Sequence, residues 1–286
     1  MHNIRLIFRL ATLLMIFSCN TVLRSTDFTE KDGFTSGIEG PATDHLGNIY
    51  AVNFQEQGTI GKTRPNGITT LFLKLPNGSI GNGIRFGLEQ QMFIADYTNH
   101  SILEVDLKTK KIEIFAHQPK ANQPNDIAVS SNTIIYASDP NWSDSTGDLW
   151  KITKEKGFEL LESNMGTTNG IEISRNGKLL YVNESVQRKI WLYDILHDGS
   201  VANKREFYSF ENYGLDGMRF DDKGNLYVCR YGKGTVAILS SKGFLLKELF
   251  LKGENPTNIT FSLDYKKCYI TMADRGCIEV VNLESL

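Results

Sequence analysis

The sequence predicts an all-β fold, a six-bladed β-propeller with four antiparallel strands per blade. Two observations support this prediction: an internal repeat of about 43 residues that occurs six times, and a β-rich segment at the same place in each repeat. A period of this length, filled by short strands and turns, is typical of propeller blades. A third observation, a strand-like segment before the first repeat, predicts how the ring closes.

Each repeat begins with a polar marker residue in front of a short apolar strand. A turn, a β-rich strand, a second turn and two further strands then follow in constant order. The spacings between successive markers are 43, 43, 44, 47 and 41 residues, and the markers are Glu39, Asn82, Asn125, Asn169, Asp216 and Thr257.

The second strand of each repeat is rich in β-branched and aromatic residues, as in 48–52 (NIYAV) and 225–229 (NLYVC). Polar turns that contain glycine precede several of these strands, as 44–47 and 221–224 do. Both features are typical of antiparallel hairpins. No segment has the pattern of a long amphipathic helix, so we expect no helical layer.

The last repeat lacks its fourth strand, because its third strand is expected at 278–282 and little chain follows. Residues 27–31 stand where the outer strand of a sixth blade belongs. We therefore expect an N-terminal strand to close the last blade, which would hide an unpaired sheet edge and tie the termini together.

Residues 1–19 have the pattern of an export signal, with Arg5 and Arg9 before an apolar stretch at 10–17 that is too short to span a membrane. Residues 20–286 are then expected to form a single domain, located in the periplasm or outside the cell. The end of the apolar stretch, 16–19 (IFSC), is similar to a lipobox. Two alternatives follow: a lipid on Cys19, which would be the only membrane contact, or ordinary signal cleavage.

Without residues 1–19, the chain has 29 basic and 33 acidic side chains, which gives a net charge near −4. No cluster of Lys and Arg marks a basic face, which excludes a nucleic-acid partner that binds by charge. A small-molecule substrate is the expected partner, and the sequence leaves the oligomeric state open.

The cysteines beyond the signal are Cys229, Cys268 and Cys277, whose spacing fits no zinc motif. Cys268 and Cys277 flank a turn between two paired strands. Either a disulfide or two buried thiols is compatible with that placement.

The markers are expected to meet in space, because the N-terminal ends of a propeller's innermost strands surround the mouth of its central channel. Five of the six markers are Asp, Glu or Asn, and none is His or Cys. Carboxylate and amide oxygens form a hard site that suits calcium better than zinc or copper. The alternative is that Asn and Asp merely initiate turns at these positions.

At these motifs the chain resembles a known family. Over residues 37–284 it is similar to the gluconolactonase, senescence marker protein (regucalcin) and diisopropylfluorophosphatase-like propellers. The resemblance rests on 38–41 (IEGP), 124–126 (PND), 139–140 (DP), 168–170 (TNG), 215–218 (LDGM), 224–228 (GNLYV) and 255–261 (NPTNITF).

The resemblance implies a metal-dependent hydrolase of a small lactone or related ester. It places Glu39, Asn125, Asn169 and Asp216 at the family's four metal-ligand positions, around one divalent cation. Calcium is the expected ion, with magnesium, manganese and zinc as alternatives. Asp216 is the candidate catalytic residue, as a base that activates water or, as discussed for members that act on phosphorus esters, as a nucleophile. A purely structural ligand is the alternative.

Substrate contacts are expected from the loops beside the metal. Gln123 stands where sugar-lactone members usually carry Arg, so specificity for an aldonolactone is not implied, and Arg230 or Arg275 are possible replacements for that donor. Asp126 matches a family position that contacts substrate. The expected substrate-binding residues are Asn82, Gln123, Asp126, Asp139, Trp142, Arg230 and Arg275, with Tyr97 and Tyr231 in the same loops.

Two other function classes remain open. One is a non-catalytic propeller that binds a partner and holds a structural calcium ion. The other is a hydrolase of aryl esters or phosphotriesters. A serine esterase is disfavoured, because the sequence has no Gly-x-Ser-x-Gly motif.

Overall fold

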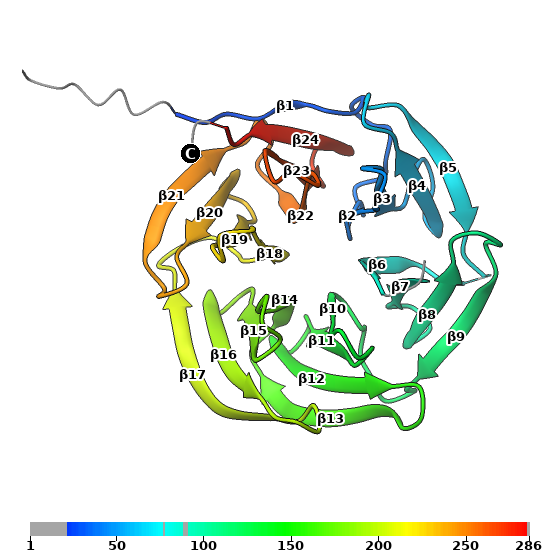
Figure 1. Cartoon of the computed structure of the whole chain (residues 1–286), viewed down its shortest axis with the longest axis vertical. Coiled ribbons are helices and arrows are strands. Elements are labelled where there is room, and N and C mark those ends of the chain that lie inside the picture. The colour runs from blue at the N-terminus through cyan, green and yellow to red at the C-terminus, as the bar shows by residue number, and fades with distance from the viewer. Residues whose placement is uncertain (1–21, 77, 88–90, 285–286) are drawn as a thin grey trace, which may run out of the picture.

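A computed structural model describes residues 22–76, 78–87 and 91–284. The strands in these residues form six four-stranded antiparallel sheets arranged as blades around a central axis (Figure 1). The expected all-β, six-bladed propeller is confirmed. The expected signal, 1–19 with Cys19, lies outside the described residues. Within the described ranges, no helix has the length and apolar character needed to cross a membrane.

Every blade repeats the same strand order from the channel outward. The innermost strands are β2 (Ala42–Thr43), β6 (Gly81–Phe86), β10 (Ile127–Val129), β14 (Thr168–Ile173), β18 (Met218–Phe220) and β22 (Pro256–Phe261). The second strands are β3 (Ile49–Val52), β7 (Gln91–Asp96), β11 (Ile135–Asn141), β15 (Leu179–Glu184), β19 (Leu226–Arg230) and β23 (Lys267–Met272).

The two outer layers complete the blades. The third strands are β4 (Thr59–Thr63), β8 (Ser101–Asp106), β12 (Thr146–Thr153), β16 (Lys189–Ile195), β20 (Thr235–Leu239) and β24 (Cys277–Asn282). The outermost strands are β5 (Thr69–Lys74), β9 (Ile112–His117), β13 (Gly157–Met165), β17 (Val201–Ser209), β21 (Leu245–Phe250) and β1 (Thr26–Asp27).

The turn between the first two strands of a blade follows from its sequence. In the first blade Asp44 Oδ1 accepts hydrogen bonds from the backbone N–H groups of Leu46 (2.9 Å) and Asn48 (2.8 Å), and Gly47 has a φ of 80°. An aspartate that binds its own backbone and a glycine at positive φ together define a tight turn. The fifth blade repeats this arrangement with Asp221 and Gly224.

The second-strand tyrosines explain how neighbouring blades pack. Tyr181 lies edge-to-face on Phe220, which ends the innermost strand of the next blade, with 5.0 Å between ring centroids. Tyr227 and Phe261 repeat the contact at 4.9 Å. The hydrophobic core therefore sits between blades, where apolar clusters combine residues of adjacent sheets, and not around the axis.

The N-terminal strand closes the ring as expected (Figure 1). β1 pairs with β24, with Thr26 opposite Val280 and Asp27 opposite Glu279. The strand begins one residue before the expected start at 27. Backbone bonds continue to Thr29, whose N–H donates to the carbonyl of Ile278 at 3.2 Å.

The disulfide alternative for Cys268 and Cys277 is wrong. Both lie on the paired strands β23 and β24, but the register places Cys268 opposite Val281 and Cys277 opposite Met272. Both thiols are free and fully buried. The other alternative, two buried thiols, holds.

Candidate metal centre

The six marker residues meet at one end of the channel. They line a single cavity of about 430 Å³. Each one lies just before an innermost strand or at its second residue, so the sixfold repeat brings together residues that lie up to 218 positions apart in the chain, from Glu39 to Thr257. The predicted convergence is therefore present.

Two of the four residues expected to bind a metal present side-chain oxygen atoms that lack protein donors. Asn125 Oδ1 and Asn169 Oδ1 are buried and have no hydrogen-bond partner within the described residues. Glu39 and Asp216 are each 8% exposed, and their carboxyl groups lie close enough to interact directly. A buried acceptor without a donor is costly, and a hard cation would satisfy all four groups at once. The residues present therefore fit a calcium-like ion.

The electrostatics of the two carboxylates support the same conclusion. Burial, with the negative charge of Asp126 nearby, raises the pKa of Glu39 to about 7. Burial and the charge of Glu39 raise the pKa of Asp216 well above its usual range. Without a counter-charge the pair holds protons that an exposed pair would release. A divalent cation supplies that counter-charge.

Asn258 orients the Glu39 carboxylate from the neighbouring blade. Its amide nitrogen donates to Glu39 Oε2 at 3.1 Å, and its own Oδ1 accepts from the N–H of Ile259 at 2.9 Å. Space for this side chain comes from Gly217, where a Cβ atom would lie 2.0 Å from Asn258 Cγ. Sequence reasoning missed Asn258, although one signal was present. The residue after each marker is Gly40, Gly83, Asp126, Gly170, Gly217 and Asn258, so two side chains stand out among four glycines.

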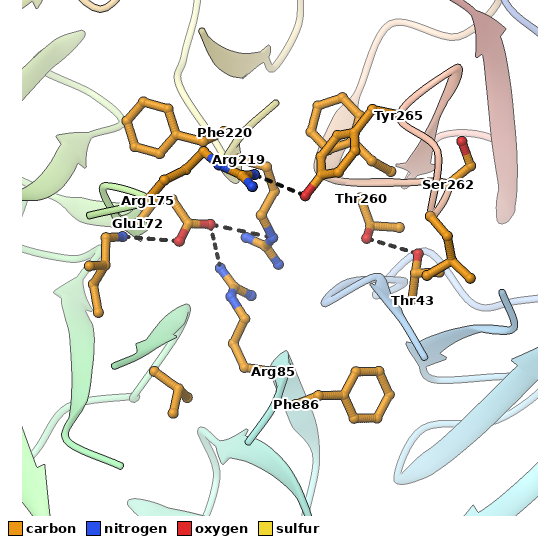
Figure 2. Close-up of a pocket in the computed structure, with 14 residues that line it drawn as sticks. Thr43, Arg85, Phe86, Glu172, Arg175, Arg219, Phe220, Thr260, Ser262 and Tyr265 are labelled. Carbon is orange, nitrogen blue, oxygen red and sulfur yellow. Dashed lines mark hydrogen bonds and ion pairs between the residues drawn. The ribbon is translucent and has the colours of Figure 1, made fainter. Parts of the chain in front are cut away.

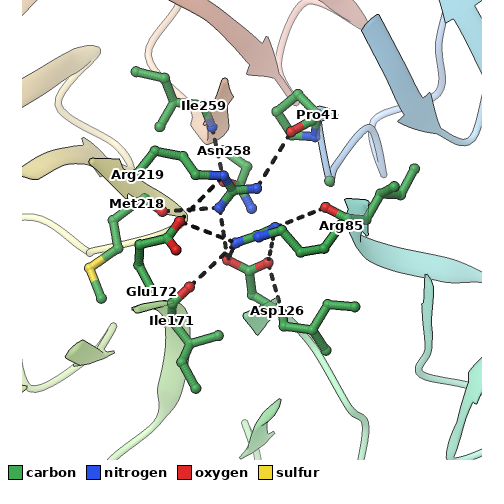
Figure 3. Close-up of polar contacts among 12 residues, drawn as sticks. Pro41, Arg85, Asp126, Ile171, Glu172, Met218, Arg219, Asn258 and Ile259 are labelled. Carbon is green, nitrogen blue, oxygen red and sulfur yellow. Dashed lines mark hydrogen bonds and ion pairs between the residues drawn. The ribbon is translucent and has the colours of Figure 1, made fainter. Parts of the chain in front are cut away.

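A charged network lies in the channel beneath the markers (Figure 3). Asp126, which is fully buried, pairs with Arg85 through two contacts of 3.0 and 3.3 Å, and Arg219 Nη1 lies 3.7 Å away. Glu172 lies 3.9 Å from Arg85 and 3.6 Å from Arg219. Two acids and two arginines thus fill the channel below the candidate metal centre.

Three of the expected substrate-binding residues line the mouth cavity: Asn82, Gln123 and Trp142. Tyr97 and Tyr231 join them, so three aromatic side chains face the cavity with the amides. Trp142 is 44% exposed and Tyr231 39% exposed. Among the described residues that line the cavity, Glu39 and Asp216 are the ionisable acids and no lysine, arginine or histidine is present.

Asp139 lies behind the cavity wall instead of in it. It is fully buried and accepts hydrogen bonds from the N–H groups of Asn122 (3.0 Å) and Gln123 (2.6 Å) and from the indole of Trp150 (2.8 Å). Its carboxylate oxygens thus accept hydrogen bonds from protein groups and do not face the cavity. The residue positions the loop that presents Gln123.

The structure does not bring the remaining expected residues to the cavity, so their assignment as direct substrate contacts is corrected. Asp126 is held one layer lower by Arg85. Arg230 is 2% exposed, with its guanidinium 3.7 Å from the ring centroid of Phe210. Arg275 pairs with Asp27 and Glu279 beside the closing strand. Sequence spacing placed both arginines after strands that end near the mouth, but it could not show which way their side chains turn.

A second cluster of potential ligands, Asp27, Cys277 and Glu279, has ligand atoms within 4.8 Å of one another. Its carboxylates are already paired with cations of the protein. Arg275 Nη1 lies 2.7 Å from Asp27 Oδ1 and also donates to Glu279, and Lys252 donates to Asp27. The marker residues at the mouth are therefore the better candidate for a metal centre.

Comparisons with known proteins agree with this architecture. Residues 28–274 match the family model described as SMP-30/Gluconolactonase/LRE-like region. The gluconolactonase of Zymomonas mobilis is 24% identical over 229 residues, covering 68% of this chain and 64% of that protein. The diisopropyl-fluorophosphatase of Loligo vulgaris is 23% identical over 284 residues, covering 88% and 90%.

A solved calcium-binding protein, regucalcin from Agrobacterium tumefaciens, superimposes with a TM-score of 0.79 at 17% identity, covering 91% of this chain and 95% of that one. At this identity the likeness concerns the fold. The chain spans less than two thirds of the length of the Zymomonas gluconolactonase.

Proposed function

Because the chain belongs to the SMP-30/gluconolactonase/LRE-like family, we propose that it is a calcium-dependent hydrolase of a small lactone or similar ester. The observation that supports this most is the set of groups at the mouth. Two buried carboxylates, and two amide oxygens that lack hydrogen-bond partners within the described residues, line one cavity that can hold a small molecule. The Zymomonas relative is called a gluconolactonase, which agrees with the proposed reaction.

Glu39, Asn125, Asn169 and Asp216 would hold the cation. A bound calcium ion would supply Lewis acidity, polarising the substrate carbonyl and stabilising negative charge that develops on its oxygen. Asn258 would keep the Glu39 carboxylate turned toward the centre through its 3.1 Å hydrogen bond.

Asp216 would act as the base. Its carboxylate would accept a proton from a water molecule as the water oxygen bonds to the lactone carbonyl carbon. The bond from that carbon to the ring oxygen then breaks, the ring oxygen takes up a proton, and a hydroxy acid results. Asn82 and Gln123 can hydrogen-bond substrate oxygens, and Trp142, Tyr97 and Tyr231 can cover the ring.

The proposal is tested by incubating the protein with γ- and δ-lactones and following proton release. Calcium-dependent turnover that a chelator abolishes, and that added calcium restores, is expected. Folding is checked in parallel by circular dichroism. Absence of turnover by a folded, calcium-loaded protein would contradict the proposal and favour a binding module with a structural calcium. Aryl esters and phosphotriesters are tested alongside, and faster turnover of either would reassign the reaction.

We also propose that the protein is exported, on the strength of residues 1–19. Expression of the full chain in a bacterial host followed by mass spectrometry tests this. A mature N-terminus near residue 20 is expected. A diacylglyceryl group on Cys19 would select the lipoprotein alternative, and an uncleaved chain in the cytoplasm would contradict export.

A further inference from the structure

The opposite end of the channel holds a second cavity, of about 370 Å³ (Figure 2). The innermost strands run from the mouth toward this end, so its wall is built by the residues that finish them, such as Thr43, Phe86 and Phe220. The charged network of Asp126 and its partners lies between the two cavities. The second cavity is therefore separate from the candidate metal centre.

The floor of this cavity contains a buried guanidinium with unused donors. Arg219 is 9% exposed, and among the described residues its one contact of ordinary hydrogen-bond length is from Nη1 to the carbonyl of Met218 at 3.0 Å. A second contact, to Pro41, is 3.5 Å long. The nearest carboxylate oxygens, of Glu172 and Asp126, lie 3.6 and 3.7 Å away. An arginine has five N–H donors, so Arg219 keeps donors available for a ligand in the cavity.

Two further arginines add positive charge to the same cavity. Arg85 is 9% exposed and its Nε has no hydrogen-bond partner within the described residues. Arg175 is exposed at the rim, where it donates to the hydroxyl of Tyr265 at 3.1 Å. No ion pair of Arg175 is present in the part of the chain that the structure describes. Against the acids Asp126 and Glu172, three arginines leave one excess positive charge.

The pKa of Arg219 also reflects its burial next to another positive charge. Burial and the adjacent positive charge of Arg85 lower the pKa of Arg219 to about 10. Two guanidinium groups are thus held close together, and the nearby carboxylates balance their positive charge only in part. An anion in the cavity would relieve this repulsion.

Part of the remaining wall consists of apolar residues, which bear on the rest of the ligand. It is formed by the side chains Phe86, Val129, Ile173, Phe220, Phe261 and Leu263. Thr43 and Thr260 add two hydroxyl groups 3.1 Å apart (Figure 2). One excess charge favours a monoanion, and the apolar wall favours a ligand with a hydrophobic body.

We propose that this rear cavity binds an apolar monocarboxylate, with Arg219 and Arg175 pairing its carboxylate and the apolar part of the wall contacting its body. The site is independent of the proposed hydrolysis, since it lies at the other end of the channel. A carboxylate and a guanidinium form paired, charge-assisted hydrogen bonds, which gives the site its preference for this group.

The test is calorimetric titration of the calcium-loaded full chain with benzoate, hexanoate, benzamide and inorganic phosphate. Saturable one-to-one binding of a carboxylate is expected, with benzamide much weaker because it lacks the charge. Absence of saturable carboxylate binding, equal affinity for benzamide, or tighter binding of phosphate would each overturn the proposal.

Variants separate the rear cavity from other sites. Arg175→Gln removes an exposed side chain and is expected to weaken carboxylate binding about tenfold, the value of one charge-assisted contact. Arg64→Gln, also exposed and outside the cavity, is the matched control and should bind as the parent does. Trp142→Ala, at the mouth, should leave the affinity unchanged. Loss of binding in Trp142→Ala, or unchanged binding in Arg175→Gln, would place the carboxylate elsewhere and overturn the proposal.

Discussion

The amide nitrogen of Asn258 donates a 3.1 Å hydrogen bond to Glu39 Oε2, across 219 positions of sequence. The contact joins the last blade to the first at the candidate metal centre. Because it restrains a carboxylate expected to bind the cation, it belongs to the hydrogen bonds that orient metal ligands.

Replacing Asn258 by Ala is expected to lower calcium affinity by about tenfold or more, because the Glu39 carboxylate loses the donor that orients it. Isothermal titration with calcium measures the effect directly, without a substrate. Asn66→Ala, in an exposed turn, serves as the control. An unchanged affinity in Asn258→Ala would show that the hydrogen bond does not support the site.

Replacing Asp216 by Asn is expected to reduce lactone turnover at least a hundredfold, since an amide cannot accept the proton of water. The reaction is measured at saturating calcium, so that a weaker metal affinity does not contribute. Unchanged turnover at saturating calcium would rule out Asp216 as the base. The melting temperature of the variant shows whether its fold is intact.

The metal-free protein is expected to lose stability as the pH rises from about 4.5 to about 7. Folding raises the pKa of Glu39 from 4.5 to about 7, so the folded state binds more protons than the unfolded chain between these values. The contribution is fully present below the unfolded pKa and is lost as the pH passes the folded one. Melting temperatures across this range, after removal of metal, measure it.

A Glu39→Gln variant isolates this contribution, because glutamine does not titrate. Its melting temperature is expected to depend less on pH than that of the parent. Added calcium should reverse the trend in the parent, since the cation binds the ionised carboxylates. Identical pH dependence in the variant and the metal-free parent would contradict the assignment.

Gly217→Ala is expected to destabilise the fold by about 1–3 kcal/mol, because its Cβ would overlap the side chain of Asn258. Asn258 cannot move away without losing its hydrogen bond to Glu39. Chemical denaturation measures the free energy of unfolding. Gly214→Ala is the control, since its Cβ would meet nothing closer than 3.4 Å. Equal stability of the two variants would mean that the residues around position 217 accommodate a Cβ atom without cost, which would contradict the prediction.

Arg275→Gln is expected to destabilise the protein by about 2–4 kcal/mol, because it leaves the carboxylate of Glu279, which is fully buried, without its cationic partner. The same substitution also releases Asp27 of the closing strand. Arg205→Gln breaks an exposed pair with Asp194 and should cost less than about 1 kcal/mol. If the two variants unfold at the same denaturant concentration, Arg275 does not secure the closure.

The period of the sequence was sufficient to predict the ring of blades. Repeated hairpin turns such as 44–47 and second-strand tyrosines such as Tyr181 act locally or between adjacent repeats. Because every unit makes the same contacts with its neighbours, a spacing of about 43 residues determines both the strand order and the convergence of the marker residues.

Only the tertiary structure decided where individual side chains point. Arg230 ends β19 and Arg275 lies in the turn after β23, both near the mouth, but Arg230 lies against Phe210 and Arg275 pairs with Glu279. Asp126 is adjacent to a marker in sequence, yet arginines from two other blades hold it within the channel. Alternation along a strand predicts a face, whereas the partner of a charged side chain depends on residues distant in sequence that meet when the ring closes. The sequence by itself therefore determined the propeller and its six converging positions, and the folded ring decided which neighbouring charges face the mouth, the channel or the rear cavity.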